Sequence, residues 1–128
     1  MKDWLNTVTK NKESTRFASQ TQENRVAKKL GGTVNANSGA GKFNKSDVVV
    51  KSASLSVECK TCMTEKGSFS IKKDWIKKHK DEAWSNGLSN SVIAFNFFYE
   101  DKEDYYVIDD KLMRFLVEKL EEEDSWFL

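Results

Sequence analysis

Two neighbouring stretches decide the fold, Asp47-Val48-Val49-Val50 and Leu55-Ser56-Val57-Glu58-Cys59-Lys60. A run of valines and an alternating apolar–polar segment are both typical of β-strands. In the second stretch Leu55, Val57 and Cys59 point to one face, and Ser56, Glu58 and Lys60 to the other. The short connection predicts an antiparallel pair that brings Asp47 beside Glu58.

The segments on either side predict alternating helices and strands. We expect a helix, capped by Ser19 or Thr21 and stopped by Gly31-Gly32, then a strand over 33–37. Further on we expect a helix over 72–85, with Trp75, Ile76, His79 and Ala83 near one face, then strands over 91–98 and 105–108. Asp109 or Asp110 caps a last helix with Leu112, Phe115, Leu116 and Leu120 on its inner stripe. This order predicts an α/β fold in which helices flank a central sheet.

The length of 128 residues fits one domain. Residues 1–18 are expected to form an arm or short helix, 19–108 the core of the domain, and 109–128 an acidic C-terminal helix. No apolar run approaches the roughly 20 residues of a membrane span, and the N-terminus does not resemble a signal peptide, so we expect a soluble cytoplasmic protein. Cys59 and Cys62 are too few for a zinc site and are expected to be reduced thiols.

Charge is divided along the chain. Residues 1–80 carry 17 basic and 7 acidic side chains, a net +10, whereas residues 81–128 carry 4 and 13, a net −9. A basic N-terminal portion suits a polyanion such as nucleic acid, from which the acidic portion would be repelled. Two solvated faces with no such ligand are the alternative.

Asp47 and Glu58 predict a metal site. Two converging carboxylates repel each other unless a divalent cation or a proton lies between them. Their hard oxygen atoms suit Mg²⁺, for which Mn²⁺ is expected to substitute. The backbone carbonyl of Cys59 is a further candidate ligand, and Glu23, on the first helix, is expected to reach the same place.

Lys60 would then lie beside a metal-bound water. We expect it to orient that water, help deprotonate it, or stabilise negative charge that develops on a phosphate. A metal, an activated water and a positive charge are the parts that phosphodiester hydrolysis requires.

Asp47 followed by Glu58-Cys59-Lys60 matches the D-x(n)-E-x-K signature of the PD-(D/E)xK nuclease superfamily, with Ser46 where proline often stands. With Glu23 in a first helix, Gly31-Gly32 and the loop Asn37-Ser38-Gly39-Ala40-Gly41, residues 19–98 resemble the archaeal-type Holliday junction resolvases, including phage and bacterial relatives.

The resemblance implies a restriction-endonuclease-like mixed central β-sheet and a homodimer that cuts four-way DNA junctions. It also implies catalytic roles for Glu23, Asp47, Glu58 and Lys60, and a contribution from Ser38. Residues 1–18 and the final helix have no counterpart in that family, so a nuclease that acts on duplex, flaps or ends remains an alternative. A DNA-binding protein without catalysis is another.

Basic residues near this site are expected to contact DNA phosphates rather than bases. They are Arg16, Arg25, Lys42, Lys45, Lys72, Lys73 and Lys77. Each of these residues could instead have a purely structural role. The lysines of the 72–85 helix would then form a solvated face, and Glu58 and Lys60 an exposed pair on a strand. Glu23 would only stabilise the helix dipole, and Ser38 would be a turn residue. The Ser38–Gly41 loop lacks the P-loop pattern, so no nucleotide cofactor is expected.

Overall fold

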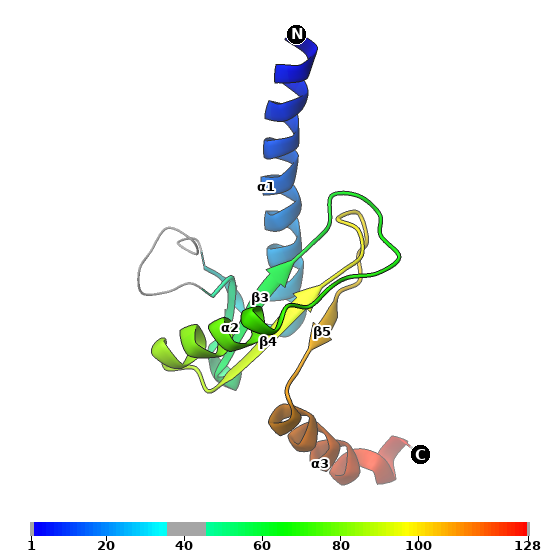
Figure 1. The fold of residues 1–128 in the computed structure, drawn as a ribbon. Helices are drawn as coiled ribbons and strands as arrows, with labels where there is room; N and C mark the ends of the chain where they lie inside the picture. Colours follow the sequence, from blue (N-terminus) through cyan, green and yellow to red (C-terminus); the bar gives the residue numbers. More distant parts are fainter. Residues whose placement is uncertain (1, 36–45, 128) are drawn as a thin grey trace.

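The protein is an α/β domain built on a five-stranded mixed sheet that three helices flank (Figure 1). The computed structural model describes residues 2–35 and 46–127, and the side chains of residues 15–35 and 46–123. Its helices are α1 (Lys2–Leu30), α2 (Lys73–Ser85) and α3 (Asp110–Phe127). Its strands are β1 (Thr33–Val34), β2 (Val48–Val50), β3 (Leu55–Lys60), β4 (Asn90–Phe95) and β5 (Tyr105–Val107).

The strands lie in the order β1-β2-β3-β4-β5. β3 and β4 are parallel, and the chain between them forms α2, as a parallel connection requires. The other neighbouring pairs are antiparallel, including the predicted pair of β2 with β3, in which Val48 lies opposite Val57. The predicted order of helices and strands is therefore confirmed.

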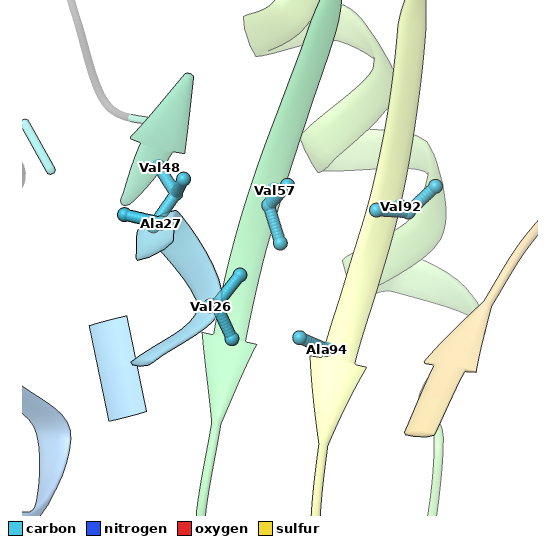
Figure 2. Close-up of a cluster of buried hydrophobic side chains, with 6 residues drawn as sticks. All are labelled: Val26, Ala27, Val48, Val57, Val92 and Ala94. Atoms are coloured by element: carbon cyan, nitrogen blue, oxygen red, sulfur yellow. The ribbon is translucent and has the colours of Figure 1, made fainter. Parts of the chain in front are cut away.

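The core lies between α1 and one face of the sheet. Val26 and Ala27 of α1 pack against valines of three strands and Ala94 of β4 (Figure 2). Those valines are Val48, Val57 and Val92. α2 covers the opposite face (Figure 1), so the alternate residues of β3 meet a different helix. The fully buried side chains Val26, Val48 and Val57 each contribute about 1.5–3 kcal/mol by leaving water.

α1 is one continuous helix, so the predicted helix start at Ser19 or Thr21 is wrong. The segment contains neither proline nor glycine, and nothing in its backbone interrupts the helix there. Its end was predicted correctly. Gly31 has a φ of +70°, the Gly32 amide donates to the Ala27 carbonyl at 2.8 Å, and a Cβ on Gly32 would approach the Val49 oxygen to 2.7 Å.

α3 begins as predicted, because the Asp109 carboxylate accepts a hydrogen bond from the Leu112 amide at 2.9 Å. The predicted inner stripe is wrong beyond Leu112, which packs against the core. Phe115 is 51% exposed, Leu116 41% and Leu120 67%. The physical reason is that α3 runs away from the sheet after β5, so only its first turn meets the domain (Figure 1).

Strands β1, β4 and β5 are shorter than predicted. β4 ends at Phe95, and the next residue, buried Asn96, accepts a hydrogen bond from the Thr61 hydroxyl at 2.7 Å and donates one to Asp104 at 3.2 Å. Within the described residues, no helix is both long and apolar enough to cross a membrane.

Candidate active site

Antiparallel pairing of β2 and β3 places Asp47 next to Glu58. Val48 lies opposite Val57, so Asp47, one residue earlier, comes level with Glu58, one residue later. The Asp47 carboxylate also accepts a hydrogen bond from the Cys59 amide at 2.9 Å. This bond fixes the carboxylate immediately before β2, beside the centre of β3.

Three carboxyl groups meet around Asp47. Burial and the neighbouring Asp47 charge and hydrogen bond raise the pKa of Glu23 from 4.5 to about 7. The same causes, opposed by Lys60, raise the pKa of Glu58 to about 7. Glu23 comes from α1 and Glu58 from β3, so two elements deliver negative charge to one position. Such a group holds either protons or a cation at neutral pH.

Lys60 shares the Glu58 face of β3, as the two-residue spacing predicts. Its ammonium Nζ lies 3.8 Å from Glu58 Oε1 and 4.5 Å from the centre of the Trp75 ring on α2. The aromatic face and the carboxylate hold the charge of Lys60 beside the carboxyl cluster. The structure thus brings together Glu23, Asp47, Glu58 and Lys60, four of the five residues predicted to be catalytic; the fifth, Ser38, lies outside the described residues.

His79 of α2 lies on the other side of Glu58 and is only 3% exposed. Its Nε2 is 3.4 Å from the Ser56 carbonyl oxygen, and its Nδ1 is 3.5 Å from Glu58 Oε2. Burial lowers the pKa of His79, so the ring is neutral at pH 7. Both neighbouring oxygens accept hydrogen bonds, so a neutral ring donates to one of them and keeps a lone pair on its other nitrogen; donation from Nε2 to the Ser56 carbonyl leaves that lone pair on Nδ1.

Glu58, His79 and Glu82 form a candidate metal-binding triad, with one ligand atom from each within 4.8 Å of the others. His79 was predicted to lie on the same helix face as Trp75, Ile76 and Ala83, but its contact with Glu58 was not predicted, and Glu82 was not named as a candidate residue. A signal was present. His79 and Glu82 are three residues apart on a predicted helix and so share a face.

Arg25 was predicted to contact DNA, but its guanidinium holds α1 to the chain after β4. Arg25 Nε and Nη2 each donate to Asp104 at 2.8 Å, and the two side chains are 15% and 1% exposed. Gln22 also donates to Asp104, at 3.2 Å, and to the Lys60 carbonyl, at 2.8 Å. This network positions Glu23, which lies between Gln22 and Arg25 in sequence.

The other predicted contacts to DNA divide into two groups. Arg16 on α1, and Lys72, Lys73 and Lys77 at the start of α2, are exposed. Ser38, Lys42 and Lys45 lie outside the described residues. The two cysteines are free, as expected. Burial, with surrounding acidic groups, raises the pKa of the Cys59 thiol, which makes it a poor nucleophile; its carbonyl stays a predicted ligand.

No protein-family model, curated protein or solved structure matches the chain. The geometry of the site therefore carries the functional argument.

Proposed function

We propose that this protein is a Mg²⁺-dependent DNA endonuclease with a restriction-endonuclease-like fold that cuts four-way junctions as a homodimer. One observation carries the proposal. The Asp47 carboxylate, level with Glu58 and bonded to the Cys59 amide at 2.9 Å, raises the pKa of both Glu23 and Glu58, and Lys60 lies 3.8 Å from Glu58. Three carboxyl groups from three elements, with one ammonium beside them, are the groups needed to hold a hard cation and hydrolyse a phosphodiester.

The donor set fits magnesium. All three side chains offer oxygen, and the pKa values of Glu23 and Glu58 are raised first by burial and then by the Asp47 charge, two costs that a bound divalent cation would offset. A bound Mg²⁺ would polarise the phosphate and lower the pKa of a coordinated water. Glu23, Asp47 and Glu58 would hold the ion, and the Cys59 amide keeps Asp47 oriented. Lys60 would orient the water and stabilise charge that develops on the phosphate.

Exposed basic residues near α2 support binding of the DNA backbone. Lys72, Lys73 and Lys77 begin the helix that covers the Glu58 face, and Lys72 Nζ is 5.6 Å from the Trp75 ring that also contacts Lys60. Phosphates drawn to these lysines would be led toward the carboxyl cluster. We leave Arg25 out of this surface because Asp104 occupies it.

A second copy of the chain is the proposed occupant of the apolar face of α3. Met113, Leu116, Val117 and Leu120 follow helical spacing and are 40–67% exposed on a helix that leaves the domain. An exposed apolar stripe of this kind is typical of an interface. Pairing of two copies would give the two active sites that paired cuts in a four-way junction require.

The decisive experiment is a cleavage assay on a labelled four-way junction with Mg²⁺, Ca²⁺ or a chelator. We expect paired symmetric cuts with Mg²⁺ only, and none from Glu58→Gln, which keeps junction binding. Glu65→Gln, an exposed glutamate after β3, is the matched control and should cut normally. Cleavage by Glu58→Gln near the parent rate would overturn the site.

A competition between the junction and linear duplex of equal length tests the substrate class. Preference for the junction supports the proposal. Preference for duplex would replace junction resolution with a restriction or repair activity on the same site. Binding without any cleavage by the parent protein would leave a DNA-binding protein of this fold.

A further inference from the structure

The imidazole of His79 is held as a metal-ligating histidine usually is. Its Nε2 contacts the Ser56 carbonyl oxygen at 3.4 Å, and the Ser56 hydroxyl in turn donates to Ser46. Histidine ligands typically donate one ring N–H to a carbonyl in this way, which fixes the tautomer and leaves the other nitrogen for the metal. In His79 that other nitrogen is Nδ1.

Nδ1 of His79 is buried, and within the described part of the chain it has no hydrogen-bond partner. It faces Glu58 Oε2 at 3.5 Å. With the ring proton on Nε2, the Nδ1 lone pair faces a carboxylate oxygen, and a proton or a cation between the two atoms would stabilise this contact. Their separation is close to the roughly 3.4 Å that tetrahedral geometry sets between two ligands of zinc.

Glu82 provides a third ligand on the same face of α2, three residues after His79. Its carboxylate oxygen completes a set in which all three ligand atoms lie within 4.8 Å of one another. Glu82 is partly exposed, so solvent has access for a fourth ligand. The triad thus combines one buried ligand, His79, with a coordination position that solvent can reach beside Glu82.

We propose that Glu58, His79 and Glu82 bind one divalent transition-metal ion, with zinc preferred over magnesium. The imidazole nitrogen gives this preference, since magnesium takes oxygen ligands whereas zinc accepts nitrogen with carboxylates. The site goes beyond the proposed function and shares one residue with it. Glu58 Oε2 faces His79, while Oε1 faces Lys60.

His79 is the only histidine in the chain, so its ring signals in an NMR spectrum need no assignment. We would label a tag-free protein with ¹⁵N-histidine and titrate it with Zn²⁺. The expected result is an Nε2–H tautomer before zinc and a shift of the Nδ1 signal that is complete at one equivalent. An Nδ1 signal unmoved by zinc would overturn the proposal and leave a shared proton between His79 and Glu58.

Calorimetry with Zn²⁺ on variants locates the ion independently. Glu82→Gln, on the protein surface, should weaken zinc binding at least about tenfold. Asp81→Asn, an exposed neighbour on α2, is the matched control and should bind as the parent does. Glu23→Gln, outside the triad, should also retain binding. Loss of zinc in Glu23→Gln with retention in Glu82→Gln would place the ion in the carboxyl cluster and refute the triad.

These measurements do not depend on DNA cleavage. A protein that binds zinc through His79 but cuts no DNA would keep this inference and refute the proposed nuclease. A protein that cuts junctions with Mg²⁺ but shows no zinc effect on His79 would do the reverse.

Discussion

Asp47→Asn should stabilise the metal-free protein at pH 8 while it abolishes cleavage. Asp47 is a cause of the raised pKa of both Glu23 and Glu58. Asparagine keeps an oxygen that accepts the Cys59 N–H, now 2.9 Å from the carboxylate, removes the negative charge, and replaces the second oxygen with an amide NH₂ of nearly the same size. The substitution therefore isolates electrostatic repulsion from packing.

The magnitude follows from Glu58, the more buried of the two glutamates. Raising its pKa from 4.5 to about 7 corresponds to about 3 kcal/mol of lost stability at high pH. Burial is the larger cause and Asp47 the second, so relief of the Asp47 charge should recover about 1 kcal/mol. Glu23 is more exposed and adds less. A gain of about 1–2 kcal/mol raises the melting temperature by roughly 3–8 °C for a domain of this size.

The sign depends on pH. The pKa values of Glu23 and Glu58 are higher in the folded than in the unfolded protein. Their contribution to the free energy of unfolding is therefore fully present below about pH 4.5, and it is lost as the pH rises through about 7. At pH 5 both glutamates of the parent protein are largely protonated, and Asp47→Asn should bring no gain. With Mg²⁺ at pH 8 the parent protein should have the higher melting temperature of the two, because only the parent binds the ion.

Thermal denaturation at pH 5 and pH 8 in chelator, and at pH 8 with Mg²⁺, measures these differences. Asp81→Asn is the control, since it removes an exposed charge on α2 away from the cluster. A lower melting temperature for Asp47→Asn than for the parent at pH 8 would refute the reasoning, as would an equal gain at both pH values.

Three further predictions test other parts of the structure. Lys60→Met should lower the single-turnover cleavage rate by about 10²-fold or more without loss of junction binding; an unchanged rate would remove Lys60 from catalysis. Asp104→Ala should cost about 3 kcal/mol in urea denaturation, because it leaves the partly buried Arg25 and the buried Gln22 and Asn96 amides without their acceptor; a cost below about 1 kcal/mol would contradict the network. Leu116→Glu with Leu120→Glu should convert a dimer to a folded monomer in light scattering, and a parent protein that is already monomeric would contradict the proposed α3 interface.

The pairing of β2 with β3, which forms the site, was predictable from sequence because the signals for it lie within a few residues of each other. Alternation assigned Val57 and Glu58 to opposite faces, and the short connection left one antiparallel register that kept Val48 and Val57 in the core. Gly31-Gly32 fixed the end of α1 for an equally local reason, the positive φ at Gly31. Such patterns act over a few residues and need no knowledge of the rest of the chain.

The errors arose where the answer depended on distant contacts. The apolar spacing of α3 predicts a stripe but not what covers it, and Leu120 is 67% exposed. His79 was expected on one helix face with Trp75, Ile76 and Ala83, and it is 3% exposed. Its contact with Glu58 depends on which face of the sheet α2 covers, and Glu82 becomes a candidate ligand only after that contact exists.

Glu58 links the two metal sites that we propose, because its two oxygens face different neighbours. One faces Lys60 at 3.8 Å and the other His79 at 3.5 Å. β3 lies between β2 and β4, so hydrogen bonds on both sides fix the backbone of Glu58. A cation at either site must displace the proton that the pKa of about 7 leaves on Glu58, and so changes the charge that the other site meets. By thermodynamic reciprocity, whatever factor zinc applies to magnesium affinity, magnesium must apply to zinc affinity.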